Sequence, residues 1–314
     1  AMTAFQTVEL GQGRCMADLG FRDSEGLVAS YFLPQEGGWT VVETGPTPCK
    51  PSLLQALGRA GIDPADVRRV FVTHIHLDHA GGLGAVCDAL PKATLYAHEA
   101  GAAHLIDPTK LIASARRAWG EAADPLWGQI VPVPSDRLVA LRGGETFPLL
   151  GGSLLAVPTP GHARHHLAYF DTASGSLMTG DAAGVRLSGG WRPRPAVPPP
   201  DLDLDALFTS LRRMSELHPR RILFTHFGES PDGVADLDRY REAVVEWRDV
   251  ALEAARANPS AEAVARSLRE FEEASAASAG HPAPQGDRGE LISGYDLAAQ
   301  GLLRYFRTRG LLPE

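Results

Sequence analysis

Short apolar segments bounded by glycine, proline or polar residues dominate the first 230 positions of the chain. Runs of four to eight residues rich in β-branched, leucine and aromatic side chains favour strands. We therefore predict strands at 26–32, 39–43, 67–73, 94–98, 152–159, 166–171, 176–179 and 221–225. The first two are predicted to form a hairpin, and residues 171–175 make the turn between two of the later strands.

Segments with helix-spaced apolar residues lie between these strands and make up most of the chain after residue 230. They predict helices at 51–60, 82–90, 236–257, 261–277 and 290–309, and another that begins at Asp201 or Asp203. A linker rich in Gly, Pro and Ala, 279–289, precedes the last helix. Strand–helix units on either side of meandering strands indicate an α/β fold of two sheets packed between helices, an αββα sandwich.

Two further segments are interpreted as additions to this core. Residues 105–128 have a helical pattern with Lys110, Arg116 and Arg117 among apolar residues, which predicts an inserted helical segment. Residues 192–200 contain too many prolines for a helix or a central strand, so we predict an extended connector. We divide the chain into a core at 1–230 and a helical extension at 231–314, which packs on the core or at a dimer interface.

Composition limits the function classes. The chain has 314 residues, of which 44% are hydrophobic and 22% charged, as is usual for a folded globular protein. A net charge of −8 and the lack of basic runs argue against a nucleic-acid partner. No apolar run of about 18 residues predicts a membrane span. The widely spaced cysteines, Cys15, Cys49 and Cys87, predict no disulfide framework, and without a recognisable secretory signal the cytoplasm is the expected location.

Metal-binding side chains are concentrated in four short segments of the sequence. The run Thr73–Gly82 reads THIHLDHAGG, and the other three segments are TPGH, TGD and THFG. Their candidate ligands are His74, His76, Asp78, His79, His162, Asp181 and His226. Imidazoles and carboxylates suit Zn, Fe or Mn, and buried groups of this kind are costly without a ligand or partner. The sequence therefore predicts a metal site where strands end.

The remaining histidines have less specific surroundings. His98, His104, His218 and His281 are interpreted as ordinary structural or surface residues. His165 and His166 follow His162 closely in the sequence GHARHH. We expect both to support the metal ligands or the structure and not to bind metal themselves.

The order and context of the four segments resemble the metallo-β-lactamase-fold hydrolase superfamily, in its glyoxalase II or lactonase-like branch. The resemblance covers roughly the first three quarters of the chain. Insertions in this superfamily often form a flap over the metals, so residues 105–128 are interpreted as either such a flap or an ordinary solvated helix. It implies a metallo-β-lactamase sandwich in which His74, His76 and His162 hold one ion. Asp78, His79 and His226 would hold a second, with Asp181 bridging the two. The expected cofactor is a pair of divalent ions, with zinc the first choice and iron or manganese as alternatives.

The implied reaction is hydrolysis of an ester, thioester or lactone bond in a small molecule. Two adjacent cations lower the pKa of a shared water and polarise a substrate carbonyl. Asp78 is the candidate to steer the water or pass a proton, and Asp181 to set the metal separation. Both aspartates are therefore predicted to be catalytic.

Differences from known branches of the superfamily narrow the range of expected substrates. Zinc β-lactamases, which resemble the chain in the first motif, lack a bridging aspartate such as Asp181. Lactonases of this fold carry a tyrosine three residues after that aspartate, where this chain has Gly184. Glyoxalase II enzymes bind glutathione through late basic and tyrosine residues, for which only Arg304 and Arg307 are candidates here. The family's usual Asp-Thr-Gly is replaced by Glu43-Thr44-Gly45, which leaves the role of Glu43 open.

Two rival functions share the fold. A persulfide-dioxygenase-like enzyme would use a single Fe(II) for oxygen chemistry, and it resembles this chain in six of the candidate ligands. A binding or scaffold module without catalysis is the other, and the complete ligand set argues against it. Metal count and oxygen dependence separate the oxygenase from the hydrolase, and function retained after loss of the bound metal would favour the module. The expected partner is a small-molecule substrate, and no membrane partner is expected. The apolar stripe of the last helix suits either the core or a second copy of the chain.

Overall fold

The computed structural model describes residues 6–186, 190–281 and 286–313. They form two compact units. The first unit comprises residues 1–158 and 165–180, and the second comprises 159–164 and 181–314. This division falls within the predicted core. The predicted domain boundary at residue 230, between the core and the helical extension, stays a prediction. Each unit is described by itself.

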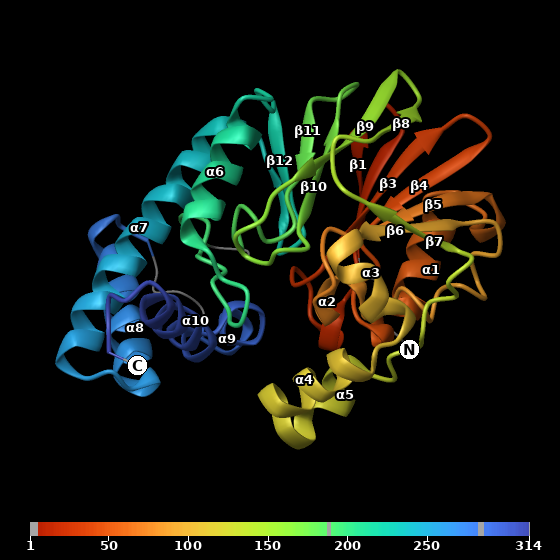
Figure 1. Cartoon of the computed structure of the whole chain (residues 1–314). Coiled ribbons are helices and arrows are strands. Elements are labelled where there is room, and N and C mark those ends of the chain that lie inside the picture. The colour runs from red at the N-terminus through yellow and green to blue at the C-terminus, as the bar shows by residue number, and fades with distance from the viewer. Residues whose placement is uncertain (1–5, 187–189, 282–285, 314) are drawn as a thin grey trace. The chain divides into compact units, whose positions relative to one another are not determined.

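The first unit contains a seven-stranded sheet in chain order (Figure 1). Its strands are β1 (Thr7–Gly11), β2 (Arg14–Asp18), β3 (Ala29–Gln35), β4 (Gly38–Val42), β5 (Val67–Phe71), β6 (Thr94–His98) and β7 (Leu138–Leu141). Neighbours from β1 to β4 pair antiparallel, and those from β4 to β7 pair parallel. The predicted hairpin is confirmed as β3 and β4, with Phe32 opposite Val41.

Four further strands of this unit form an antiparallel series. They are β8 (Thr146–Leu149), β9 (Gly152–Pro158), β10 (Leu167–Asp171) and β11 (Ser176–Met178). Aromatic rings join them to the first sheet: the ring of Phe71 on β5 lies 4.8 Å from that of Phe147 and 5.2 Å from that of Tyr169. The core therefore lies between two sheets, and the predicted fold class is confirmed.

A buried ion pair also joins the two sets of strands. The Arg14 guanidinium on β2 donates to both carboxylate oxygens of Asp171 on β10, at 2.5 and 3.2 Å. Ser174 donates its hydroxyl to the same carboxylate at 2.6 Å. The arginine and aspartate side chains are 2% and 0% exposed, so each depends on the other for its charge to be compensated.

Helices of the first unit follow its strands. They are α1 (Lys50–Arg59), α2 (Leu77–Ala80), α3 (Glu99–Ile106), α4 (Thr109–Trp119) and α5 (Ala123–Trp127), with short 3₁₀ turns at Phe21–Asp23, Thr47–Cys49, Pro64–Asp66 and Gly120–Ala122. The last three α-helices cover most of the segment interpreted as an insertion. No residue of α4 is buried.

The predicted helix at 82–90 is wrong. The regular helix here is the single turn of α2, and a series of turns follows it. Gly82 donates its N–H to the Gly45 carbonyl, and a Cβ at Gly84 would lie 2.0 Å from the Val131 oxygen. Close backbone contacts, made by residues with poor helix propensity, replace the continuous helix that the apolar spacing predicts.

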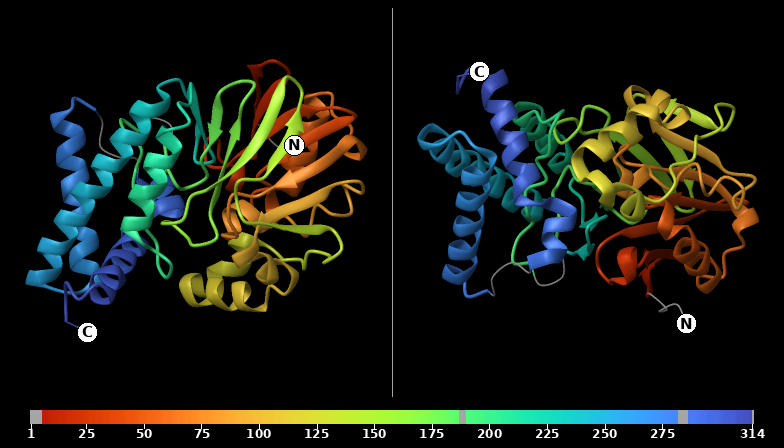
Figure 2. Two further views of the ribbon diagram at one scale, coloured as in Figure 1. Left: turned by 45° about the horizontal axis from the view of Figure 1, so that its top comes forward. Right: turned by 90° about the horizontal axis from the view of Figure 1, so that it is seen from below.

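The second unit is largely helical. Its elements are α6 (Leu204–Ser215), β12 (Arg221–Phe224), β13 (Gly228–Ser230), α7 (Gly233–Ala257), α8 (Ala261–Ser278), α9 (Gly286–Ser293) and α10 (Tyr295–Thr308). The long helices α7, α8 and α10 pack against one another (Figure 2). Asp203 caps α6 through the backbone N–H groups of Asp205 and Ala206, as predicted.

The prediction of a single helix at 290–309 is wrong, because this segment belongs to two helices, α9 and α10. Gly294 adopts an extended conformation between α9 and α10, and a Cβ there would lie 2.7 Å from the Glu290 oxygen. The predicted linker at 279–289 overlaps α9, and part of it lies outside the described residues. Residues 192–200 contain no helix or strand, as expected.

Candidate metal centre

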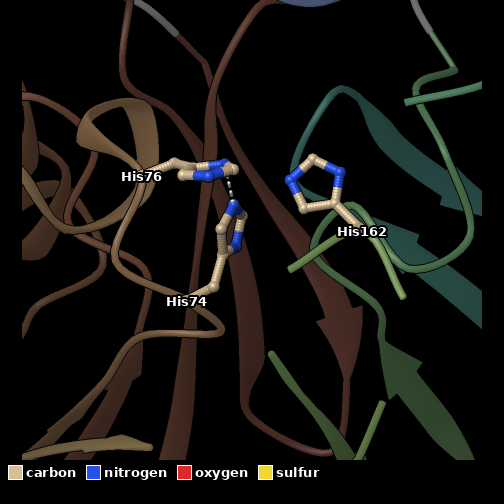
Figure 3. Close-up of side chains that lie close together, drawn as sticks. All are labelled: His74, His76 and His162. Atoms are coloured by element: carbon tan, nitrogen blue, oxygen red, sulfur yellow. Dashed lines mark hydrogen bonds between the residues drawn. The ribbon is translucent and has the colours of Figure 1, made fainter. Parts of the chain in front are cut away.

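The first cluster of candidate ligands lies on the loop between β5 and α2. Its backbone leaves a buried strand at Phe71 and enters a helical turn at Leu77, which places four polar side chains within one short segment. His74 Nε2 and His76 Nδ1 are 2.9 Å apart (Figure 3). The ring centroids of His74 and His79 are 4.0 Å apart, and Asp78 Oδ2 lies 3.7 Å from His79 Nε2. The first unit thus brings its four predicted ligands together.

Glu43 orients one of these imidazoles. It follows β4, is fully buried, and has a φ of 73°, a left-handed conformation uncommon for a residue with a side chain. Its Oε1 accepts from the Thr73 hydroxyl at 2.5 Å and lies 3.1 Å from His79 Nδ1. A carboxylate can only accept here, so His79 holds a proton on Nδ1 and keeps the Nε2 lone pair available for a cation. The longer side chain in place of the family's aspartate therefore still reaches a candidate ligand.

We expect Glu43→Ala to weaken metal binding by about 10- to 100-fold, the usual effect of removing a group that orients a ligand imidazole. Competition with a chromophoric chelator measures the affinity. Glu36→Ala, an exposed glutamate in the turn between β3 and β4, is the matched control and should leave it unchanged. Equal affinities for the two variants would remove Glu43 from the site.

The second unit contains the other three candidate ligands. His162 follows β9, Asp181 follows β11 and His226 follows β12, and their exposed fractions are 2%, 4% and 0%. Asp181 Oδ2 lies 3.5 Å from His162 Nε2, and its Oδ1 lies 3.6 Å from His226 Nε2. Each oxygen of one carboxylate thus faces a different imidazole, the arrangement that a bridging ligand requires.

These distances fit ligands that share a cation better than they fit direct hydrogen bonds. N–H···O bonds usually measure 2.7–3.2 Å. Two ligand atoms about 2.0–2.1 Å from one tetrahedral ion are separated by roughly 3.4 Å. His162 Nδ1 donates to the Ala196 carbonyl at 2.9 Å, so in the neutral ring the Nε2 lone pair is directed toward Asp181. A lone pair facing a buried carboxylate favours a cation between them.

Two histidines that are not candidate ligands lie against the first cluster. The ring of His166 stacks on that of His74 at 4.8 Å, and the ring of His165 lies 5.8 Å from that of His76. Both are buried. Their places agree with the expectation that they support the ligands. His98, by contrast, caps α3 by accepting the Ala100 N–H at 3.0 Å, which confirms its structural role.

Arg116 and Arg117 both contact side chains of their own segment, residues 105–128. Arg116 pairs with Asp124 at 3.1 Å on an exposed surface, and Arg117 donates to the Ser114 hydroxyl at 2.7 Å. The hydrogen bond from His162 to the Ala196 carbonyl was not predicted from the sequence. Every residue has a backbone carbonyl, so the residue type at position 196 gives no indication of this role. The flap function of residues 105–128 stays a prediction.

Residues 23–226 match the model of the metallo-beta-lactamase superfamily, and this segment includes all seven candidate ligands. The chain belongs to that superfamily. It is 31% identical over 162 residues to a metallo-beta-lactamase fold-containing protein of Sulfurisphaera tokodaii; the match covers 51% of the chain and 60% of the relative, less than two thirds of its length.

Two other similarities bear on function and fold. A hydroxyacylglutathione hydrolase of Synechococcus is 26% identical over 151 residues, covering 48% of the chain and 47% of that enzyme. The crystal structure of a beta-lactamase domain protein from Burkholderia ambifaria matches with a TM-score of 0.69 and 21% identity, over 100% of this chain and 92% of that one. Within the described residues, no helix has the length and apolar character needed to span a membrane.

Proposed function

We propose that the chain is a metal-dependent hydrolase that cleaves an ester, thioester or lactone bond of a small molecule at a dinuclear centre. The observation that carries the proposal is the Asp181 carboxylate, each of whose oxygens faces a different buried imidazole. The superfamily match and the hydroxyacylglutathione hydrolase relative support acyl-bond hydrolysis.

The proposed ligand sets are those that the family resemblance implies. His74, His76 and His162 would hold one ion, Asp78, His79 and His226 would hold the other, and Asp181 would be shared by both. When bound, divalent ions such as zinc lower the pKa of water and polarise a carbonyl oxygen. The residues fit such ions because the donor set is nitrogen and oxygen only, and because Glu43 and Ala196 fix the tautomers of two imidazoles.

The two aspartates of the site, Asp78 and Asp181, have different proposed roles. Asp78 is 14% exposed in its side chain and Asp181 is 5% exposed, so Asp78 is the carboxylate with better access to solvent. We assign Asp78 to orient the attacking water and to accept its proton. Asp181 keeps the two ligand sets in register. The candidate ligands His74, His79, His162 and His226 are buried, so they would limit the contact of bound ions with bulk water.

A comparison of substrates tests the proposal on protein loaded with zinc. A glutathione thioester, a homoserine lactone, an aryl ester and a phosphodiester are offered under identical conditions. We expect at least one acyl substrate to react faster than the phosphodiester by roughly 10²-fold, a preference of the size that contacts in one pocket can provide. Removal of metal by a chelator should abolish the reaction.

Other outcomes separate the alternatives. Two ions per chain with activity in the absence of oxygen agree with the hydrolase. A single iron, together with turnover that consumes oxygen, would replace it with the oxygenase. Slow rates on all four substrates, unaffected by the chelator, would overturn the proposed reaction class.

A further inference from the structure

The backbone of Ala196 joins a candidate metal ligand to the C-terminal helices. Its carbonyl accepts the Nδ1–H of His162 at 2.9 Å, and its N–H donates to the Tyr240 hydroxyl at 3.4 Å. The exposed fractions of these three residues are 2% for His162, 3% for Ala196 and 0% for Tyr240. One peptide segment thus connects the imidazole ring to α7 through two buried hydrogen bonds.

The connector that contains Ala196 is poor in hydrogen-bond donors. Its sequence, RPRPAVPPP from Arg192 to Pro200, includes five prolines, which have no N–H group. It therefore cannot be held by a continuous sheet ladder. Its backbone position depends on the side chains that reach its carbonyl groups and its few N–H groups.

Helices of the same unit provide those side chains at several points along the connector. Ser293 donates its hydroxyl to the Pro195 carbonyl at 2.8 Å, and Arg304 Nε donates to that of Pro200 at 3.1 Å. On α10, a Cβ at Gly301 would lie 2.0 Å from the Val197 oxygen, so the helix and the connector are in backbone contact.

The first residue of the connector is fixed by charge. Arg192 Nη2 lies 3.0 Å from Glu272 Oε2, its Nε lies 3.3 Å from Glu272 Oε1, and it also pairs with Glu246. Trp247 donates its indole N–H to Glu272 at 2.9 Å. Both ends of the connector are therefore attached to the helices that follow it in the chain.

Packing fixes the position of the Tyr240 ring. A Cβ at Gly184 would lie 2.4 and 2.6 Å from two ring carbons of Tyr240, and 2.5 Å from the Arg194 carbonyl. The φ of Gly184 is +81°, which also favours glycine. Burial, with a smaller contribution from Asp181, raises the pKa of Tyr240, so its phenol stays protonated at neutral pH.

We propose that Tyr240 is a positioning residue for the metal ligand His162, acting through the backbone of Ala196. The inference rests on the proposed function, because it takes His162 as a ligand. The C-terminal helices then contribute to metal affinity although they provide no ligand themselves. The hydroxyl accepts the Ala196 N–H, which fixes the carbonyl that in turn orients the imidazole.

The test compares variants of the full chain that each lose one tyrosine hydroxyl. We expect Tyr240→Phe to weaken zinc binding by about 10-fold or more in a chelator competition. It should also alter the visible spectrum of the cobalt-substituted protein, which reports ligand geometry. Tyr295→Phe is the matched control, because the Tyr295 hydroxyl is buried in the same unit and has no hydrogen-bond partner in the described part of the chain. It should leave both readouts unchanged.

Two further variants keep the outcomes distinguishable. Ser293→Ala removes one anchor of the connector and should weaken zinc binding in the same direction but less, even if Tyr240→Phe folds poorly. His162→Ala tests the ligand itself. Loss of zinc in His162→Ala with wild-type affinity and spectrum in Tyr240→Phe and Ser293→Ala overturns the positioning role alone. Full zinc binding by His162→Ala overturns the ligand assignment of the proposed function.

Discussion

Asp181→Ala is expected to abolish most catalytic activity and to reduce the bound metal below two ions per chain. Its two carboxylate oxygens face His162 and His226 separately, so the substitution removes a ligand from both proposed ions. Loss of a group that merely orients a ligand costs about 10- to 100-fold. Loss of a shared ligand should therefore lower kcat/KM by more than about 10²-fold.

The measurement pairs kcat/KM on the best acyl substrate with metal analysis after dialysis. Asp238→Ala, which removes an exposed aspartate on α7, is the control for the loss of one negative charge. Circular dichroism establishes that both variants are folded. If Asp181→Ala retained two ions and normal activity, a centre bridged by this residue would be ruled out.

Arg14→Met should have the largest effect on stability. The substitution leaves the buried Asp171 carboxylate without its guanidinium partner, and breaking such a pair costs about 3–5 kcal/mol of unfolding free energy. Because Asp171 also accepts from Ser174 and from the Ala173 N–H, part of the compensation remains and the lower end of the range is expected. Chemical denaturation followed by fluorescence gives the change.

Arg142→Met is the corresponding control. Its guanidinium pairs with Glu99 at 2.7 Å, but the two side chains are 80% and 47% exposed. An exposed pair of this kind contributes little to the free energy of unfolding, because solvent screens both charges. Adding Asp171→Leu to Arg14→Met should recover part of the lost stability, because the unpaired charge is removed. Equal stability of the two arginine variants would show that the buried pair is dispensable.

The sequence predicted the strands whose signals are local. β6 has the predicted range, and the strand before His74, the β9–β10–β11 series and the Asp203 cap follow from short apolar runs and capping residues. All seven candidate ligands lie in the segments that follow such strands, because a strand that leaves a buried sheet presents rigid side chains beyond its end. Motifs of a few adjacent residues were therefore enough to name them as candidates.

Most of the other strands gave no comparable signal. In β1 most residues are at least partly exposed, and β13 is only Gly228–Ser230, so neither contains an apolar run. β2 and β8 were also not predicted, and β7 was missed although Leu138–Leu141 is an apolar run of the kind that favours a strand. They form because an adjacent strand supplies the hydrogen bonds, which is a tertiary effect.

Contacts between distant residues also explain the functional details that sequence reasoning missed. The absence of a tyrosine at Gly184 is visible in the sequence, whereas the presence of the Tyr240 ring beside that position is not. The role of Glu43 was left open for the same reason, because its partner His79 is brought to it by strand pairing between β4 and β5.

The acceptor for His162 is a main-chain carbonyl, which has a consequence for how such proteins diverge. Any small residue at position 196 presents the same oxygen, so the identity of that residue is under little selection from the metal. Selection acts instead on the distant side chains that fix the peptide, including Tyr240 and Ser293. We expect homologues to change these anchors together while position 196 varies independently. Substitutions in helices that provide no proposed ligand would then reveal how the metal centre has evolved.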